Sequence, residues 1–196
     1  SSSTDPSGGV FYPDYFGKNF VLNDLTHDGG LTAIRIEGPT NSVDQRVNRL
    51  SKELGLLDQE LSILDNEQSN IFWSRTKNLE VFKSLKSNLL RIVLPMSETL
   101  QVIQKLKSYD IKYFVDWGGS LIWAAFETLN AKILSDIKDI VKKHQGYITL
   151  IKIEDDLKAS ADIFTIDPIK YKISEKIKRS FDPKRIFNPG KMYTGI

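Results

Sequence analysis

Arg91 has a type and a setting that suit ligand binding. It lies inside the apolar segment LLRIVLP, where the alternation of a strand would turn its side chain away from Leu90, Ile92 and Leu94. A guanidinium in that position can pair with a neighbouring Asp or Glu of the protein, or it can hold a ligand carboxylate through two parallel hydrogen bonds. The residues alone leave both interpretations open.

A pair of glycines offers a second place where a ligand could approach the backbone. Gly118 and Gly119 separate the β-rich runs KYFVDW and SLIWAAFE, which is typical of a tight hairpin whose central residues need φ > 0. In a purely structural interpretation, Trp117 and Trp123 pack across the two strands. In a functional interpretation, the glycines bring backbone N–H groups close to a ligand and Trp117 forms an aromatic wall.

The segment SFDPKRIFNPGKMY, near the end of the sequence, makes specific demands on the backbone. Asp182 with the following proline predicts a turn after a helix, and Ile186 and Phe187 are expected to insert as an apolar plug. The triplet NPG at 188–190 predicts a second tight turn that exposes the Asn188 amide. Two fixed turns indicate either a rigid arm held against another body or simply a well-anchored end of the chain.

The composition excludes several other kinds of site. Cysteine is absent, which excludes disulfides, thiolate chemistry and cysteine-ligated metal centres. His27 and His144 lie far apart in the sequence, so neither a histidine metal site nor a Ser-His-Asp triad is supported. No glycine-rich phosphate-binding motif follows a predicted strand. The acidic run at 154–156 is typical of a solvated loop.

The charge and hydropathy patterns limit the possible partners. The formal net charge of +2 argues against a large nucleic-acid interface. Residues 168–196 contain eight Lys/Arg and two Asp/Glu, which favours a solvated basic helix face and leaves an acidic partner as the alternative. No apolar run approaches the roughly 18 residues that a membrane span needs. Residues 1–20 do not resemble a signal peptide and are expected to form a flexible lead.

The elements that would position these residues are short and alternate in type. Apolar patterns predict strands at 31–38, 61–65, 89–95, 112–117, 120–127 and 147–153. One helix is predicted after an N-cap at Thr40 or Asn41, with Gly55 ending it, and further helices are predicted at 66–83, 97–106, 130–145 and 168–179. The side chains expected to face inward from the second and third helices are Ile71, Phe72, Leu79, Phe82, Leu100, Ile103 and Leu106.

From Leu89 onward, the predicted order is β-α-β-β-α-β, the ferredoxin-like arrangement. We therefore expect an α+β fold with an antiparallel sheet and helices on one face, and the preceding elements are expected to extend that sheet. The opposite face would be covered by solvent or by another body. Residues 21–196 are expected to form a single domain.

The C-terminal segment IKRSFDPKRIFNPGKMY resembles the C-terminal signature of the FAD-linked oxidases of the vanillyl-alcohol-oxidase and para-cresol-methylhydroxylase type, a phrase of the form FDP-x-x-x-x-NPG-[KR]. Within that family, the sequence is most similar to the glycolate oxidase E-subunit branch. The stretches that carry this further likeness are THDGGLTAIRIEG, LLRIVLP, YFVDWGGSLIW and HQGYITLIK. The histidine-rich metal motif of the related 2-hydroxyacid dehydrogenases has no counterpart, so the resemblance implies no metal site.

The resemblance implies a cap domain that closes over a flavin, with FAD bound mainly by a domain that this chain does not contain. The implied cofactor contacts are Asn188, Gly190 and Lys191. The residues expected to contact substrate are Arg91, Trp117, Gly118 and Gly119. No catalytic residue is assigned.

The reaction implied for the whole complex is oxidation of a 2-hydroxy acid, glycolate to glyoxylate, with flavin as the acceptor. The implied partners are the FAD-binding domain, a flavin subunit and an iron–sulfur subunit. The complex would be cytoplasmic and peripheral to the inner membrane through its partner subunits. A different class of function stays open, namely a free-standing ferredoxin-like interaction or ligand-sensing module without flavin chemistry.

Overall fold

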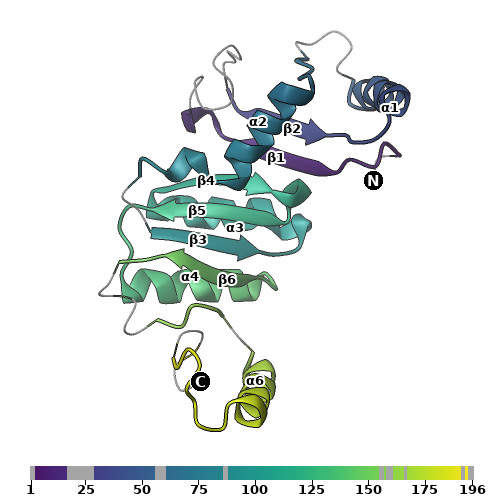
Figure 1. The fold of residues 1–196 in the computed structure, drawn as a ribbon. Coiled ribbons are helices and arrows are strands. Elements are labelled where there is room, and N and C mark those ends of the chain that lie inside the picture. Colours follow the sequence, from purple (N-terminus) through teal and green to yellow (C-terminus); the bar gives the residue numbers. More distant parts are fainter. Residues whose placement is uncertain are drawn as a thin grey trace. The chain divides into compact units, whose positions relative to one another are not determined.

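The computed structural model describes residues 3–16, 29–55, 61–85, 88–154, 157, 161–165, 167–190 and 193. The strands are β1 (Gly8–Tyr12), β2 (Leu31–Arg35), β3 (Asn88–Val93), β4 (Ile111–Asp116), β5 (Leu121–Phe126) and β6 (Tyr147–Lys152). The α-helices are α1 (Thr40–Glu53), α2 (Asn66–Lys77), α3 (Thr99–Leu106), α4 (Ala131–Lys143) and α6 (Pro168–Phe181). Figure 1 shows these elements along the chain.

The strands form a six-stranded antiparallel sheet in the order β2-β1-β4-β5-β3-β6. From β3 onward the chain runs β3-α3-β4-β5-α4-β6, so the predicted α+β class is confirmed and the arrangement is compatible with a ferredoxin-like fold. The chain divides into two compact units. The first is Ser1–Ser84 with Phe114–Gly119, and the second is Leu85–Tyr113 with Ser120–Ile196.

The first unit is built around a buried aromatic cluster. The Tyr12 ring lies 4.8 Å from the Phe114 ring and meets the Phe72 ring edge-on at 6.3 Å. The Tyr12 hydroxyl donates a hydrogen bond of 2.9 Å to Thr76 Oγ1, which in turn donates to the Phe72 carbonyl. Burial raises the pKa of Tyr12 far above its usual value, because the phenolate would lose its hydration. This cluster joins β1 and β4 to α2.

Residues 1–20 were expected to form a flexible lead. This prediction is wrong for residues 8–12, which form strand β1. It pairs with β2 along its whole length, from Gly8 opposite Arg35 to Tyr12 opposite Leu31. Its glycines and the serines before it favour a loop, and the strand forms because its partners supply the hydrogen bonds. Local sequence therefore gave the wrong assignment here.

Two further predictions in the first unit are wrong. Residues 61–65 form no strand, and Leu61 and Ile63 are exposed. The helix expected over 66–83 ends at Lys77, because Leu79 adopts a left-handed φ of 53° that no α-helix continues through. Residues 80–82 then form a short 3₁₀ turn.

Side-chain directions in the predicted helices are only partly confirmed. Phe72, Phe82, Ile103 and Leu106 are buried as expected, whereas Ile71 and Leu100 are exposed. The predicted N-cap at Thr40 or Asn41 is wrong, because α1 already begins at Thr40 and its N-cap position is Pro39, which makes no side-chain capping hydrogen bond.

The second unit packs α3 and α4 on one face of strands β5, β3 and β6 (Figure 1). The pairing sets Arg91 of β3 opposite Trp123 of β5 and Thr149 of β6. Helix α4 begins at Ala131, one residue after the predicted start, and Asn130 is its N-cap, whose Oδ1 accepts a hydrogen bond from the Ile133 N–H. The buried apolar side chains of β3, β5, β6, α3 and α4 on this face include Leu90, Ile92, Val102, Leu106, Ile122, Phe126, Leu134, Ile137, Val141 and Ile148.

A short segment after β6 lines the free edge of that strand. The Leu150 N–H donates to the Ile163 carbonyl at 2.8 Å, and the Thr165 N–H donates to the Ile148 carbonyl at 3.0 Å. Thr165 Oγ1 also accepts from the Ile148 N–H at 2.8 Å. The backbone groups of β6 that point away from β3 are therefore paired at these positions.

Gly146 stands where a side chain does not fit, so we expect Gly146→Ala to destabilise the protein by about 1–3 kcal/mol. A Cβ there would lie 2.7 Å from Val141 Cγ1 and 2.9 Å from the Val93 carbonyl oxygen. Urea unfolding measures the effect. The matched control is Gly9→Ala, whose Cβ would meet no atom nearer than 3.4 Å. Equal stability of the two variants would contradict the prediction.

Candidate functional site

The turn after α6 is held by one buried carboxylate. Asp182 accepts hydrogen bonds of 2.9 Å from the backbone N–H groups of Ile186 and Phe187. Lys178 Nζ lies 2.7 Å from the same carboxylate and also donates to the Phe187 carbonyl. The hydrogen bond from Lys178 is the main cause that lowers the pKa of Asp182 to about 2, helped by the two backbone donors. The first predicted turn is therefore present and tightly fastened.

The second turn exposes the groups that were predicted to face a cofactor. Asn188 and Gly190 adopt left-handed φ angles of 46° and 67°, and both residues are exposed. A Cβ on Gly190 would meet nothing within 4 Å, so its backbone is open to a ligand. Lys191 lies outside the described residues.

The apolar plug predicted between these two turns does not form. Ile186 and Phe187 are 65% and 68% exposed, and no contact of their side chains with the core is described. Their backbone N–H groups are the parts that point inward, toward Asp182. The turn is thus fixed by charge and hydrogen bonds and not by burial of apolar side chains.

The hairpin between β4 and β5 is confirmed, but its turn is longer than two glycines. Three consecutive residues, Trp117, Gly118 and Gly119, have φ angles of 54°, 60° and 110°. The Asp116 carboxylate accepts a 2.7 Å hydrogen bond from the Trp117 N–H and so stabilises the first of them. Trp117 is 57% exposed and belongs to the turn, so it does not pack across the strands as the structural interpretation expected.

Arg91 is half-buried in the second unit, in a β3 position that alternates with the fully buried Leu90 and Ile92. Its lateral neighbours in the paired strands are Trp123 and Thr149, an aromatic and a hydroxyl side chain. The predicted site residues thus lie in three separate places. The hairpin residues belong to the first unit, whereas Arg91 and the C-terminal turn belong to the second.

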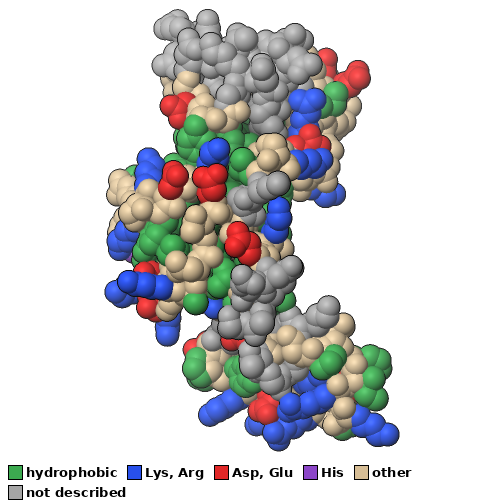
Figure 2. Space-filling model, turned by 90° about the vertical axis from the view of Figure 1, so that its left-hand side faces the viewer, with side chains coloured by type: hydrophobic (Ala, Val, Ile, Leu, Met, Phe, Trp, Pro, Cys, Tyr) green, Lys and Arg blue, Asp and Glu red, His purple; other side chains and the backbone are tan. Residues whose placement is uncertain are grey.

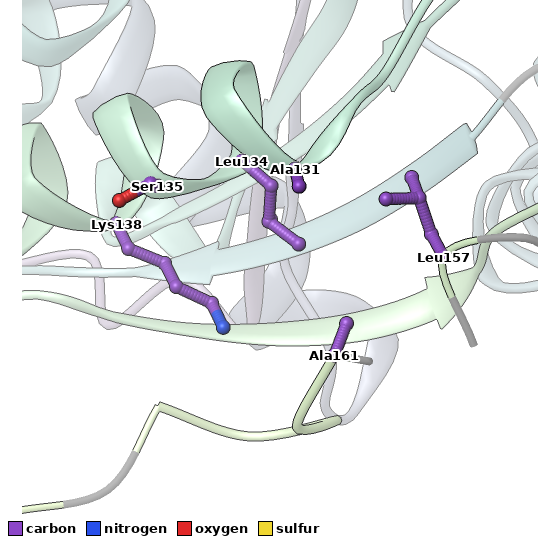
Figure 3. Close-up of a pocket in the computed structure, with 6 residues that line it drawn as sticks. All are labelled: Ala131, Leu134, Ser135, Lys138, Leu157 and Ala161. Carbon is purple, nitrogen blue, oxygen red and sulfur yellow. The ribbon is translucent and has the colours of Figure 1, made fainter. Parts of the chain in front are cut away.

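Sequence reasoning missed a small pocket in the second unit. It has a volume of about 150 Å³, and its walls come from α4 and from the segment after β6 (Figure 3). The lining residues are Ala131, Leu134, Ser135, Lys138, Leu157 and Ala161. None of the predicted site residues is among them. The sequence predicts helix α4, which forms one wall of the pocket. The other wall, at Leu157 and Ala161, comes from a segment without a periodic apolar pattern, so no sequence signal could locate the pocket.

A chain of polar side chains joins α3 to the end of α4. Glu98 Oε2 lies 2.6 Å from His144 Nδ1, and Lys105 Nζ lies 2.7 Å from His144 Nε2. Because an ammonium group has no acceptor, Lys105 donates to Nε2, and Nδ1 then carries the proton that is donated to Glu98. His144 is buried, so these bonds satisfy both ring nitrogens. The sequence had indicated only a histidine at a helix end.

Comparison with known proteins adds no family assignment. No protein-family model matches the chain, and no curated protein matches it either. Within the described ranges, no group of three or more His, Cys, Asp or Glu side chains is placed to hold a metal ion. No helix among the described residues is both long and apolar enough to cross a membrane.

Proposed function

We propose that this chain is the C-terminal cap domain of an FAD-linked oxidoreductase subunit of the glycolate oxidase E type. The observation that carries this proposal is the C-terminal turn, in which Asp182 fixes the backbone while Asn188 and Gly190 stay open. An exposed amide beside an unobstructed glycine suits close contact with a flat, polar ring. The resemblance of the segment FDPKRIFNPGK to the signature of flavin-dependent oxidases supports a flavin as that ring.

The described residues suit the edge of a flavin and not the whole cofactor. The pocket beside α4 measures about 150 Å³, whereas small-molecule and cofactor sites measure roughly 300–1,000 Å³. In line with the family resemblance, most contacts with FAD are proposed for a separate FAD-binding domain. The further proposed partners are a flavin subunit and an iron–sulfur subunit.

The chain's own residues would bind and orient. The bound flavin supplies the acceptor for oxidation of the 2-hydroxy acid, such as glycolate. The Asn188 amide would donate a hydrogen bond to the ring, and Arg91 would pair with the substrate carboxylate through its guanidinium. The hairpin residues Trp117, Gly118 and Gly119 belong to the first unit and are proposed separately as residues that contact substrate.

We expect Asn188→Ala to weaken flavin retention in the assembled protein by roughly five- to tenfold, because one hydrogen bond to the ring is lost. The melting temperature of this chain should change by less than about 2 °C, since the side chain is exposed. The measurement is an FAD titration by flavin fluorescence, with a separately expressed FAD-binding domain added.

Two variants make that measurement decisive. Asn188→Gly removes the amide without opposing the left-handed backbone, so it should lose flavin as Asn188→Ala does. Asn78→Ala removes an exposed asparagine from the end of α2 and should leave the titration unchanged. Absence of FAD binding with the added domain would overturn the proposal and favour a free-standing ferredoxin-like module.

A further inference from the structure

Helix α6 carries an apolar stripe that the described structure leaves exposed. Four large side chains recur every fourth residue, and Ile169, Ile173, Ile177 and Phe181 are 70%, 53%, 55% and 84% exposed. A spacing of four residues places them along one side of the helix. No residue of α6 is buried. The surface of a soluble protein rarely exposes so continuous a row of large apolar side chains unless it binds a partner there.

The helix is fastened at both ends and along its opposite side. The Asp167 carboxylate caps its start by accepting from the Ile169 N–H at 2.8 Å, and Asp182 holds its end. On the other side, the Tyr171 ring meets the Tyr193 ring at 6.0 Å. The apolar stripe is therefore presented outward on a formed helix and is not a frayed end of the chain.

Basic side chains border the stripe. At 100° per residue, Lys172 and Lys176 lie along one margin, and Lys170 lies near the other. Glu175 is the acidic residue within the helix, and it pairs with Arg179 at 2.8 Å. Figure 2 shows hydrophobic and basic side chains gathered together in its lowest part, where α6 and the following turn lie. The surface is therefore apolar along one line and positive on both sides of it.

The residue types along the border of the stripe distinguish between an acidic protein and an anionic lipid surface as the partner. Protein interfaces are enriched in Trp, Tyr and Arg and depleted in Lys. The stripe holds neither Trp nor Tyr, and the charged residues nearest to it are lysines, whose long stems can lie on apolar surface while the ammonium reaches water or phosphate. An amphipathic helix with this pattern is suited to lie in a lipid headgroup layer.

We propose that α6 binds an anionic lipid surface, with Ile169, Ile173, Ile177 and Phe181 among the acyl chains and the lysines at the headgroups. The helix has 14 residues and lies in the plane of the interface without spanning it. Ile186 and Phe187, exposed in the turn that follows, add apolar surface to the same end of the chain. This proposal is independent of flavin binding.

The test is co-sedimentation of the full chain with lipid vesicles. We expect binding to vesicles of phosphatidylcholine mixed with phosphatidylglycerol, and at least roughly tenfold weaker binding to phosphatidylcholine alone. Ile173→Gln with Ile177→Gln should reduce binding to the anionic vesicles by about tenfold or more. Lys172→Gln with Lys176→Gln should reduce it as well and should weaken its dependence on salt.

Matched controls keep the test specific. Leu100→Gln changes an exposed apolar residue of α3, and Lys132→Gln changes an exposed lysine of α4, so neither should alter vesicle binding. Circular dichroism verifies that the α6 variants fold. Vesicle binding that is absent, or that the α6 variants leave intact, would overturn the proposal. Absent vesicle binding combined with α6-dependent capture of an acidic amphipathic peptide would instead assign the surface to a protein.

Discussion

Replacing Phe114 by alanine is expected to lower the free energy of unfolding by about 3–5 kcal/mol. Phe114 is fully buried, and its ring stacks on the Phe82 ring at 5.6 Å and contacts the Tyr12 ring in a tilted arrangement at 4.8 Å. Alanine would leave a cavity bounded by the Tyr12 ring of β1 and the Phe82 ring of the 3₁₀ turn after α2. Those rings cannot close the gap without disturbing the hydrogen bond from Tyr12 to Thr76.

Urea unfolding with linear extrapolation measures this loss. Phe11→Ala is the matched control, because Phe11 pairs with Val115 in the adjacent strand but is 38% exposed. The control is expected to cost at most about 2 kcal/mol. Phe114→Leu should recover part of the stability by refilling the cavity. A loss for Phe114→Ala no larger than that for Phe11→Ala would show that the aromatic cluster does not organise the first unit.

Replacing Asp182 by asparagine is expected to release the C-terminal turn. The carboxylate is the common acceptor for Lys178 and for the backbone N–H groups of Ile186 and Phe187. A neutral amide loses the ion pair and has a single acceptor oxygen, so these bonds cannot all persist. We expect amide hydrogens in the peptide 183–190 to exchange roughly tenfold faster at neutral pH.

The same turn should open on acidification. The pKa of Asp182 in the folded chain is about 2, below the value of about 3.9 for an unperturbed aspartate. A depressed pKa means that the carboxylate stabilises the fold above about pH 4 and that this contribution is lost as the pH falls through about 2. The amide chemical shifts of Ile186 and Phe187 should follow that titration.

Asp167→Asn provides the control for both experiments. Asp167 caps the other end of α6 with one backbone hydrogen bond and makes no described contact with the turn. Exchange in the peptide 183–190 should therefore stay at the parent rate in this variant. If Asp167→Asn accelerated it as much as Asp182→Asn, fraying of α6 and not the carboxylate would account for the effect.

Sequence reasoning succeeded where local chemistry decides the structure. The hairpin at Gly118, the helix that follows Asn130 and the start of α6 at Pro168 each depend on a few neighbouring residues, and each is present. The same reasoning correctly predicted that Asn188 is exposed, because a proline and a glycine follow it directly. These are positions where backbone conformation and capping leave few alternatives.

Two of the wrong predictions, and one feature that was missed, depend on contacts between distant residues. Residues 61–65 were predicted as a strand, but within the described part of the chain no strand pairs with them. The sequence of β1 is typical of a loop, and the strand forms because it pairs with β2 and β4. Glu98, Lys105 and His144 meet only because α3 and α4 pack on one sheet face, so their chain of hydrogen bonds is invisible to a local reading.

The segment at 163–165 also has a consequence for how copies of this protein behave in concentrated solution. An uncovered edge strand is a template on which a second molecule can add its own strand, the usual first step of sheet-based aggregation. Along β6, the backbone N–H and C=O groups that a second molecule could pair with are already hydrogen-bonded to Ile163 and Thr165. A chain shortened before Ile163 would therefore expose this edge and should polymerise more readily than the intact protein.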